Sequence, residues 1–324
     1  MAEALRSPPA SRTLAMGEAE RVAGASVEAP FGQALVALGR RRADVVALTA
    51  DLGKYTDVLP FRDAFPDRFF NVGMAEQNLV AVSAGLAQAG KIPYCTTYGV
   101  FATRRAYDFI AIGCAHARLN VKIIAGLPGL TTGYGGTHQA VDDLGLMRMI
   151  PGLVVIDPCD ATDIVQATEA IADHDGPVYM RLQRAAVPVV LDPARYRFRI
   201  GAAHLLREGS DVGIISTGLM TARALEAATT LAARGVAASV LHVPTLKPFD
   251  SDAVLALAAG VDRLVVAETL FTEGLARPLA RVGLPDHYLE CGSVPFLQEK
   301  YGLTAAAIER AALGRLGAGR EARR

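Results

Sequence analysis

The sequence predicts an α/β protein with mostly parallel sheets, divided into two domains. Short apolar runs alternate with helical patterns along most of the 324 residues, and this alternation is typical of βαβ units. Hydrophobic residues make up 51% of the chain, aromatic residues only 6%, and there is no Trp. The core is therefore mainly aliphatic, which suits sheets covered on both faces. The chain is also longer than one ordinary core requires.

The first half of the chain carries the more regular alternation. Near-continuous apolar runs predict buried strands at 44–49, 69–72, 92–97, 121–125, 153–157 and 178–182. Helical patterns between them predict helices over 31–42, 75–89, 101–117 and 161–173. Asp160 or Thr162 is suited to cap the first turn of the last of these helices.

A boundary is expected over 187–199, where Pro188 and Pro193 interrupt the pattern. A second alternating unit follows, with strands at 211–216, 237–243 and 263–268, helices at 221–234 and 252–259, a third helix, and a short strand near 288–291. Gly235 ends its helix where a left-handed residue is favoured. The predicted organisation is a flexible extension over 1–27, a first domain over 28–190, a smaller second domain over 200–315 and a flexible tail over 316–324.

Composition argues against several classes of protein. Lys+Arg and Asp+Glu both number 33, so charge gives no reason to expect nucleic acid or an anionic membrane as a partner. No stretch approaches the roughly 18 apolar residues of a membrane span. The first 30 residues lack the apolar segment of a secretory signal. The four cysteines show no metal-ligand spacing and are expected to be free thiols in a reducing cytoplasm.

The segment 71–78 (NVGMAEQN) places a carboxylate where ligands commonly bind. A predicted strand runs into Gly73, and a helix is expected to begin near Ala75, so Glu76 lies in its first turn. In open parallel sheets, ligands bind where strands end and helices begin. The helix dipole also favours a carboxylate at this position, so the spacing alone fits an ordinary helix N-terminus equally well.

Three other clusters follow predicted strands, and each also has an ordinary structural explanation. Tyr98 and Phe101 lie at the end of a strand, where aromatic residues are most often part of the core. His138 lies in a glycine-rich loop, 133–139 (GYGGTHQ), in which glycines allow close backbone approach to a ligand. A lone loop histidine is usually a surface residue. Asp51 precedes Gly53 and fits a turn as well as a binding site.

Several segments, taken together and in order, resemble the transketolase and 1-deoxyxylulose-phosphate synthase family. They are 69–78 (FFNVGMAEQN), 50–52 (ADL), 98–101 (YGVF), 136–139 (GTHQ) and 218–220 (GLM). The resemblance extends from about residue 31 to 313. The chain is most similar to the C-terminal section of a split transketolase, in which the enzyme is divided between two polypeptides. This resemblance implies a thiamin diphosphate-binding, pyrimidine-type parallel-sheet domain followed by a transketolase C-terminal domain.

The resemblance also implies roles for individual residues. Glu76 would hydrogen-bond N1′ of the coenzyme's pyrimidine, so that N4′ removes the proton from the thiazolium C2. To share that proton, Glu76 is expected in an apolar pocket. Phe101 would stack on the pyrimidine, with Tyr98 lining the same pocket and Asp51 facing the coenzyme. His138 would bind the C1 and C2 oxygens of the donor sugar and serve as a catalytic residue beside Glu76.

The chain departs from the family pattern around the substrate. Arg104 replaces a usual Tyr, and either it or Arg105 also fits a solvated surface charge. Tyr134 stands where many transketolases carry an acid. Family residues that bind substrate phosphate align with Gly126 and Glu28, whereas Arg184 is retained. We therefore expect a substrate site that includes His138, Arg184 and Tyr134, with altered phosphate recognition.

The Gly-Asp-Gly…Asn segment, through which thiamin enzymes hold the diphosphate and its metal, does not occur in the sequence. No metal site is therefore expected in this chain. Mg²⁺ and the diphosphate are expected on a separate polypeptide, the N-terminal section of the split transketolase. The expected assembly is a heterotetramer with two copies of each chain, in which this chain also self-associates through its pyrimidine and C-terminal domains. The chain alone is expected to be inactive. The rival predictions are a β subunit of a 2-oxoacid dehydrogenase E1, a deoxyxylulose-phosphate-synthase-like enzyme, or a non-catalytic paralogue.

Overall fold

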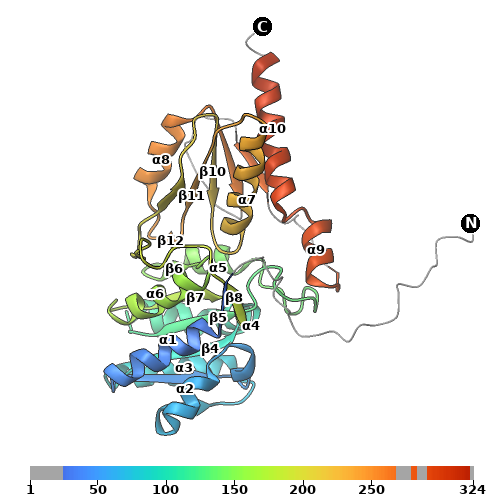
Figure 1. Ribbon diagram of the computed structural model, residues 1–324. Helices are drawn as coiled ribbons and strands as arrows, with labels where there is room; N and C mark the ends of the chain where they lie inside the picture. Colours follow the sequence, from blue (N-terminus) through green and yellow to red (C-terminus); the bar gives the residue numbers. More distant parts are fainter. Residues whose placement is uncertain (1–24, 268–278, 283–289, 322–324) are drawn as a thin grey trace, which may run out of the picture.

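The computed structural model describes residues 25–267, 279–282 and 290–321, which form two α/β units packed against each other (Figure 1). The first unit is built on a seven-stranded sheet with the order β12-β6-β7-β5-β4-β2-β3. All its strands are parallel except β12, which pairs antiparallel with β6. Their bounds are β2 (Val45–Thr49), β3 (Phe69–Asn71), β4 (Ile92–Tyr98), β5 (Lys122–Gly126), β6 (Val154–Ile156), β7 (Val178–Leu182) and β12 (Thr245–Lys247).

Helices cover both faces of this sheet, as the apolar strands predict. Successive residues of β2 point to opposite faces, so Val45 and Ala47 belong to one apolar cluster and Val46 and Leu48 to the other. The first face is covered by α1 (Pro30–Arg41), α2 (Leu59–Ala64) and α6 (Ala161–Ala172), and the second by α3 (Glu76–Gln88), α4 (Gly99–Asp108) and α5 (Asp143–Met149).

The second unit contains a five-stranded sheet with the order β14-β13-β10-β11-β9, in which only β9 is antiparallel. One face packs on α7 and α10 and the other on α8. The strands are β9 (His204–Arg207), β10 (Val212–Ser216), β11 (Ala238–His242), β13 (Arg263–Ala267) and β14 (Leu279–Val282); the helices are α7 (Met220–Ala233), α8 (Ser251–Gly260), α9 (Val294–Lys300) and α10 (Ala305–Glu321).

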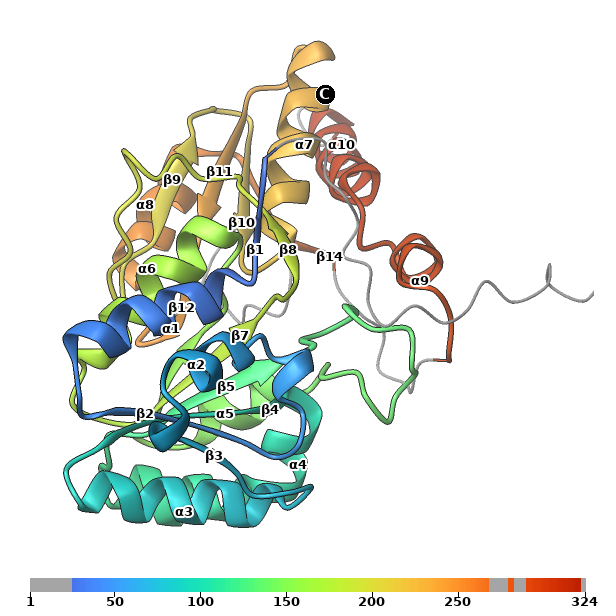
Figure 2. The ribbon, with the colours of Figure 1, turned by 60° about the horizontal axis from the view of Figure 1, so that its bottom comes forward.

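The two units share a core. Strand β12 leaves the second unit and extends the sheet of the first. Val254 and Leu257 of α8 belong to the same apolar cluster as Val46 and Leu48 of β2. A two-stranded ribbon of β1 (Ser26–Glu28) and β8 (Ala186–Pro188) lies beside the two sheets (Figure 2). The second unit is therefore an integral part of the fold that holds the first unit's loops.

A close backbone approach fastens this junction. The Gly218 amide donates to the Asp157 carbonyl oxygen at 3.1 Å. A Cβ atom on Gly218 would lie 2.5 Å from the Asp157 carboxylate, and its φ of +52° also disfavours other residues. Arg181 donates to Asp157 at 3.2 Å and to Asp143 at 2.5 Å, all three side chains being buried. Only glycine fits at position 218.

The structure corrects several predicted boundaries. Strand β1 occupies residues 26 and 27 of the predicted flexible extension 1–27, because it pairs with β8; residues 1–24 lie outside the described residues. Helix α10 runs to Glu321 through most of the predicted tail 316–324, since Ala and Arg favour a helix. The helix predicted over 101–117 breaks at Ala106 and continues as a π-helix over Phe109–His116.

Two predictions concern the strands near the C-terminus. Residues 288 and 289 of the predicted strand 288–291 lie outside the described residues, and the last two have no strand structure. Glu268, the predicted end of the strand 263–268, also lies outside them, and β13 ends at Ala267. In the described part of the chain, no helix combines the length and apolar character needed to cross a membrane.

Lys122 at the start of β5 generates a prediction about stability. Its ammonium is buried, and Nζ donates to the carbonyl oxygens of His174 at 2.7 Å and Gly176 at 2.8 Å. Burial lowers the pKa of Lys122 from 10.5 to about 7. Between these values the unfolded chain binds a proton that the folded chain does not, so unfolding becomes less favourable as pH rises.

We expect Lys122→Met to remove this contribution. Between about pH 7 and about pH 9, the free energy of unfolding of the natural chain should rise by about 2 kcal/mol relative to that of the variant. Urea unfolding of both chains at the two pH values measures the difference, and the other titrating groups cancel. Identical pH dependence in the two chains would show that Lys122 stays charged when folded.

Candidate active site

The predicted site residues converge at the carboxyl edge of the first sheet. Asp51, Glu76, Phe101, His138 and Arg184 follow the ends of β2, β3, β4, β5 and β7, respectively. These five strands are neighbours in one parallel sheet, in the order β7-β5-β4-β2-β3. Their carboxyl ends therefore lie along one edge, which is where open parallel sheets bind ligands.

Glu76 is the first residue of α3 and is almost completely buried, at 3% exposure for the whole residue. The turn before it contains Gly73, with a φ of +75°. Asn71 braces this turn, because its Oδ1 accepts from the amides of Gly73 at 3.0 Å and Asp51 at 3.1 Å. Its Nδ2 donates to Asp51 Oδ1 at 2.8 Å. Asp51 is thus an exposed turn residue that holds the segment leading to Glu76.

An aromatic wall adjoins the carboxylate. The rings of Tyr98 and Phe101 lie 5.6 Å apart, and the His138 ring meets Phe101 edge-on at 5.3 Å. Tyr134 lies 5.4 Å from His138. Burial raises the pKa of Tyr98 to about 12, so its hydroxyl stays protonated. The structure therefore brings together four aromatic residues from two separate segments of the sequence, 98–101 and 133–139.

The loop that carries His138 is held from two sides. Arg104 donates to both Asp142 oxygens, at 3.0 and 3.1 Å, and to the Gly136 carbonyl oxygen at 3.2 Å. From the second unit, the Gly292 amide donates to the Gly133 carbonyl oxygen at 3.0 Å. A Cβ atom on Gly133 would lie 2.1 Å from the Gly292 oxygen. Arg104 is therefore a brace for the His138 loop, and this contact requires glycine at position 133.

Sequence reasoning noted that Arg105 fits a solvated surface charge and missed its contact with Glu76. Its Nη1 donates to Glu76 Oε1 at 2.9 Å, and its Cζ lies 4.0 Å from the centroid of the Phe101 ring. The Arg105 side chain is 50% exposed and that of Glu76 only 4%. Glu76 is therefore ion-paired, in contrast to the apolar pocket expected for it. The sequence feature that could have revealed this contact is the spacing of Phe101 and Arg105. Residues four apart on a helix are neighbours on its surface, so Arg105 lies next to the predicted stacking residue.

Arg184 contacts the aromatic wall indirectly, through the ring of Tyr55. Its Cζ is 5.5 Å from the Tyr55 ring, and Tyr55 is 6.3 Å from Tyr98. Tyr55, from the short turn after β2, was also missed, because a single aromatic residue in a turn gives no distinctive pattern. The retained guanidinium is thus connected to the aromatic wall through one further ring.

The pKa of His138 is lowered from its ordinary value of 6.5, first by burial and then by the positive charge of Arg105. Its Nδ1 lies 2.8 Å from the Thr137 hydroxyl oxygen. At neutral pH the imidazole is therefore uncharged, with one ring nitrogen able to donate and the other to accept. A neutral imidazole next to an aromatic wall suits hydrogen bonding to substrate oxygens.

The residues fit the aminopyrimidine end of thiamin diphosphate. A planar group with N–H donors, the Arg105 guanidinium, already stacks on Phe101 while donating to Glu76. The face of Phe101 therefore suits a flat group that reaches Glu76 with a nitrogen. Phe101, Tyr98 and Glu76 are the residues that would hold the coenzyme ring.

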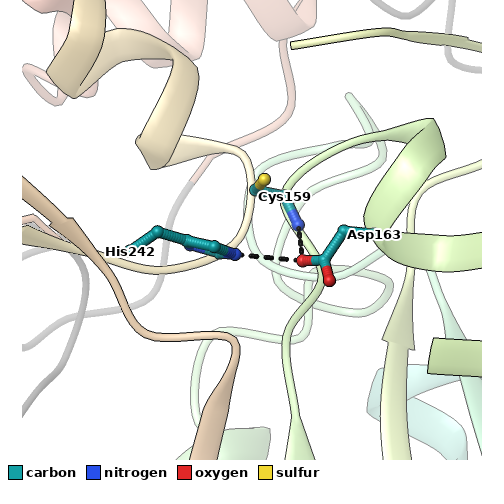
Figure 3. Close-up of side chains that lie close together, drawn as sticks. All are labelled: Cys159, Asp163 and His242. Carbon is teal, nitrogen blue, oxygen red and sulfur yellow. Dashed lines mark hydrogen bonds and ion pairs between the residues drawn. The ribbon is translucent and has the colours of Figure 1, made fainter. Parts of the chain in front are cut away.

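Cys159, Asp163 and His242 form the one group of potential metal ligands among the described residues (Figure 3). Asp163 Oδ2 accepts from the Cys159 amide at 2.9 Å and lies 3.0 Å from His242 Nε2. Tyr196 donates to Asp163 Oδ1 at 2.8 Å, and His242 Nδ1 lies 2.9 Å from the Thr221 hydroxyl. The group offers fewer ligands than a structural zinc site, and hydrogen bonds already satisfy the carboxylate. We interpret it as a buried polar tie between α6 and β11.

Comparison with known families identifies two domains along the chain. Residues 24–189 match the family "Transketolase, pyrimidine binding domain", and residues 201–308 match "Transketolase, C-terminal domain". These two matches cover most of the chain. The chain belongs to the transketolase family.

Individual relatives point to the same part of a transketolase. The chain is 52% identical over 296 residues to a putative uncharacterized transketolase family protein of Sinorhizobium fredii, with 86% of each chain covered. It is 43% identical over 282 residues to a 6-deoxy-6-sulfo-D-fructose transketolase subunit of a Clostridium species, covering 83% of this chain and 87% of the relative. Among solved structures, a split gene transketolase described as an inactive beta4 tetramer matches with a TM-score of 0.82 and 40% identity, covering 90% of this chain and 98% of that one.

The environment of His138 generates a prediction that needs no substrate. We expect His138 to titrate below 6.5 in the full chain, and Arg105→Met to raise its pKa because the nearby positive charge is removed. The contribution of His138 to stability is then present above pH 6.5 and is lost as pH falls towards the lowered pKa. NMR titration of the imidazole protons, assigned with a His138→Gln variant, measures both values. A pKa at or above 6.5, unmoved by the Arg105 substitution, would contradict this electrostatic account.

Proposed function

We propose that this chain is the pyrimidine-binding subunit of a split, thiamin diphosphate-dependent transketolase. The observation that carries the proposal is the carboxylate of Glu76, which is 3% exposed and faces a planar cation stacked on Phe101. A buried carboxylate at a helix N-terminus next to a stacking platform is the arrangement that a coenzyme aminopyrimidine requires. When bound, thiamin diphosphate supplies a carbanion equivalent that adds to carbonyl groups.

The chain's own residues orient this chemistry and move one proton. Glu76 holds a proton at the pyrimidine nitrogen, and Phe101 fixes the plane of the ring. Burial by neighbouring side chains excludes water from the carboxylate, which strengthens its hydrogen bond. The Asn71–Asp51 brace keeps Glu76 at the start of α3.

His138 is proposed to bind the sugar oxygens next to the reacting carbon. It faces Phe101 and Tyr98, at 5.3 and 6.1 Å between ring centroids, and is neutral at neutral pH. A neutral imidazole can donate to one oxygen and accept a proton from another. Arg104, which holds the loop, positions His138 without entering the reaction.

The donor we propose is a ketose with an anionic end. Arg184 supplies a guanidinium, which suits phosphate or sulfonate oxygens, and the Tyr134 ring lies 5.4 Å from that of His138. The Clostridium relative is named for 6-deoxy-6-sulfo-D-fructose, a ketose that carries a sulfonate. Gly126, at the position where many family members have a phosphate-binding side chain, has no side chain, and a Cβ atom there would make a tight 3.0 Å contact with Thr56 Cγ2. The chain's anion site therefore depends mainly on Arg184.

A second polypeptide is proposed to hold the diphosphate and Mg²⁺. The sequence lacks the family's metal-binding segment, and the relatives named above match this chain along more than four-fifths of their own length. Large apolar side chains are also exposed on the elements around Glu76. They are Phe70 (41%), Met74 (79%), Phe109 (40%) and Ile112 (60%). We propose that the partner covers these side chains in a cytoplasmic heterotetramer that contains two copies of each chain.

The alternative is a β subunit of a 2-oxoacid dehydrogenase E1 or a deoxyxylulose-phosphate-synthase-like enzyme. These enzymes would use Glu76 in the same way but would consume a 2-oxoacid donor. Donor preference in the reconstituted complex separates the two proposals.

Replacing Glu76 with Gln is expected to lower the rate of ketol transfer by about 10²–10⁴-fold, the usual contribution of a positioned acid–base group. The assay mixes this chain with its diphosphate-binding partner, a ketose phosphate or sulfonate, and an aldose phosphate. Glu169→Gln is the matched control, because Glu169 lies in an exposed ion pair with Arg41 of α1, on the other face of the sheet from Glu76. Full activity of the Glu76 variant, or turnover of 2-oxoacids alone, would rule out the proposed reaction.

A further inference from the structure

Arg105 makes, in the chain by itself, the two contacts proposed for the coenzyme ring. Its guanidinium is planar, lies 4.0 Å above the Phe101 ring and donates to Glu76 Oε1 at 2.9 Å. An aminopyrimidine bound as proposed would also be planar, would stack on Phe101 and would share a proton with Glu76. The guanidinium therefore occupies the place of the coenzyme ring.

The two groups cannot occupy this place together. A separation of 4.0 Å between the guanidinium carbon and the ring centroid is a direct stacking contact, and leaves no room for a second flat group between them. The rest of the Phe101 environment is also occupied, with Tyr98 at 5.6 Å and His138 edge-on at 5.3 Å. Coenzyme binding thus requires Arg105 to move.

Fewer contacts restrain the Arg105 side chain than restrain that of its neighbour, Arg104. Among the described residues, Glu76 is the only hydrogen-bond partner of the Arg105 guanidinium, and the side chain is half exposed. Arg104, in contrast, is held by both oxygens of Asp142 and by the Gly136 carbonyl. A long side chain with one partner and an exposed stem can swing into solvent at little cost.

The ion pair also explains how the chain tolerates Glu76 before the coenzyme arrives. A carboxylate buried without a partner is strongly destabilising. Arg105 compensates this charge, and the coenzyme ring would take over the hydrogen bond when it binds. In its paired position the positive charge of Arg105 also lowers the pKa of His138.

We propose that Arg105 is a displaceable placeholder for the coenzyme's aminopyrimidine, which keeps Glu76 paired in the coenzyme-free chain and has to leave the Phe101 face when the coenzyme binds. This inference rests on the proposed function. It assigns to Arg105 a positioning role that sets coenzyme affinity, separate from the roles of Glu76 and Phe101. Because the placeholder competes with the coenzyme, removing it should strengthen binding.

The test is the dissociation constant of thiamin diphosphate for the reconstituted complex, measured by calorimetry in saturating Mg²⁺. Arg105→Met keeps an unbranched side chain but can neither donate a hydrogen bond nor form an ion pair. It should lower the dissociation constant by about tenfold, because the coenzyme no longer has to displace one stacked, partly exposed ion pair. Arg105→Lys keeps the charge without the flat guanidinium and should give an intermediate value. Arg41→Gln, which removes an exposed arginine from α1 on the other face of the sheet, is the control and should leave the constant unchanged.

A second measurement does not involve the coenzyme. Thermal unfolding of the full chain with Arg105→Met, Glu76→Gln and both changes should give non-additive shifts, because each single change breaks the same pair. Additive shifts would show that the pair does not stabilise the folded chain. An unchanged or weaker coenzyme affinity in Arg105→Met, with the natural complex binding normally, would overturn the placeholder alone. Failure of the natural complex to bind thiamin diphosphate would overturn the proposed function together with it.

Discussion

A carboxylate buried at the start of a helix must have a group beside it that compensates its charge, and the arrangement of this site follows from that constraint. Glu76 is 3% exposed, and the helix N-terminus alone supplies only part of the stabilisation that water would give. In the chain by itself, Arg105 provides the remaining hydrogen bond, with Phe101 beneath it. We propose that a coenzyme nitrogen replaces Arg105 in the assembled enzyme. The Glu76 carboxylate then forms a stabilising ion pair with Arg105 in the chain by itself, and would hold a proton at the coenzyme in the assembled enzyme.

The fold keeps these side chains in place by bracing the loops that carry them. Parallel pairing brings five loops to one sheet edge, but loops at an edge need further support. Asn71 and Asp51 hold the turn before Glu76, while Arg104 and Asp142 hold the loop of His138. Gly292, from the second unit, contacts that same loop at Gly133. The second unit therefore contributes directly to the geometry of the site, in addition to sharing a core with the first.

Much of the fold followed from the sequence, because strands covered on both faces leave a clear apolar signature. The six predicted strands of the first unit correspond to β2 through β7, and the sheet order places the predicted site residues at one edge. Strands β1, β8, β9, β12 and β14 were missed. Each has only three or four residues and depends on pairing with another segment of the chain, so its stability comes from tertiary contacts rather than from local pattern. The break at Ala106 was missed for a similar reason, since nothing in the local composition of 101–117 marks a π-helix.

At the site, residue types were easier to predict than partners. The sequence singled out Glu76, Phe101 and His138, and the structure brings these residues into one cluster around Phe101 through Arg105. It did not reveal that Glu76 pairs with Arg105, or that Tyr55 lies between Tyr98 and Arg184. Such contacts depend on how helix α4 and the turn after β2 are oriented, which is a property of the packed fold. Substrate identity depends on the same kind of contact and on a partner chain.

The central claim is that the Glu76 carboxyl controls the acidity of the coenzyme's C2 position. The most direct measurement is the rate at which deuterium from solvent replaces the C2 proton of thiamin diphosphate, followed by NMR in the reconstituted complex without substrate. The account predicts fast exchange with the natural chain and a loss of about 10²–10⁴-fold in Glu76→Gln, with coenzyme still bound. Equally fast exchange in the variant would contradict it.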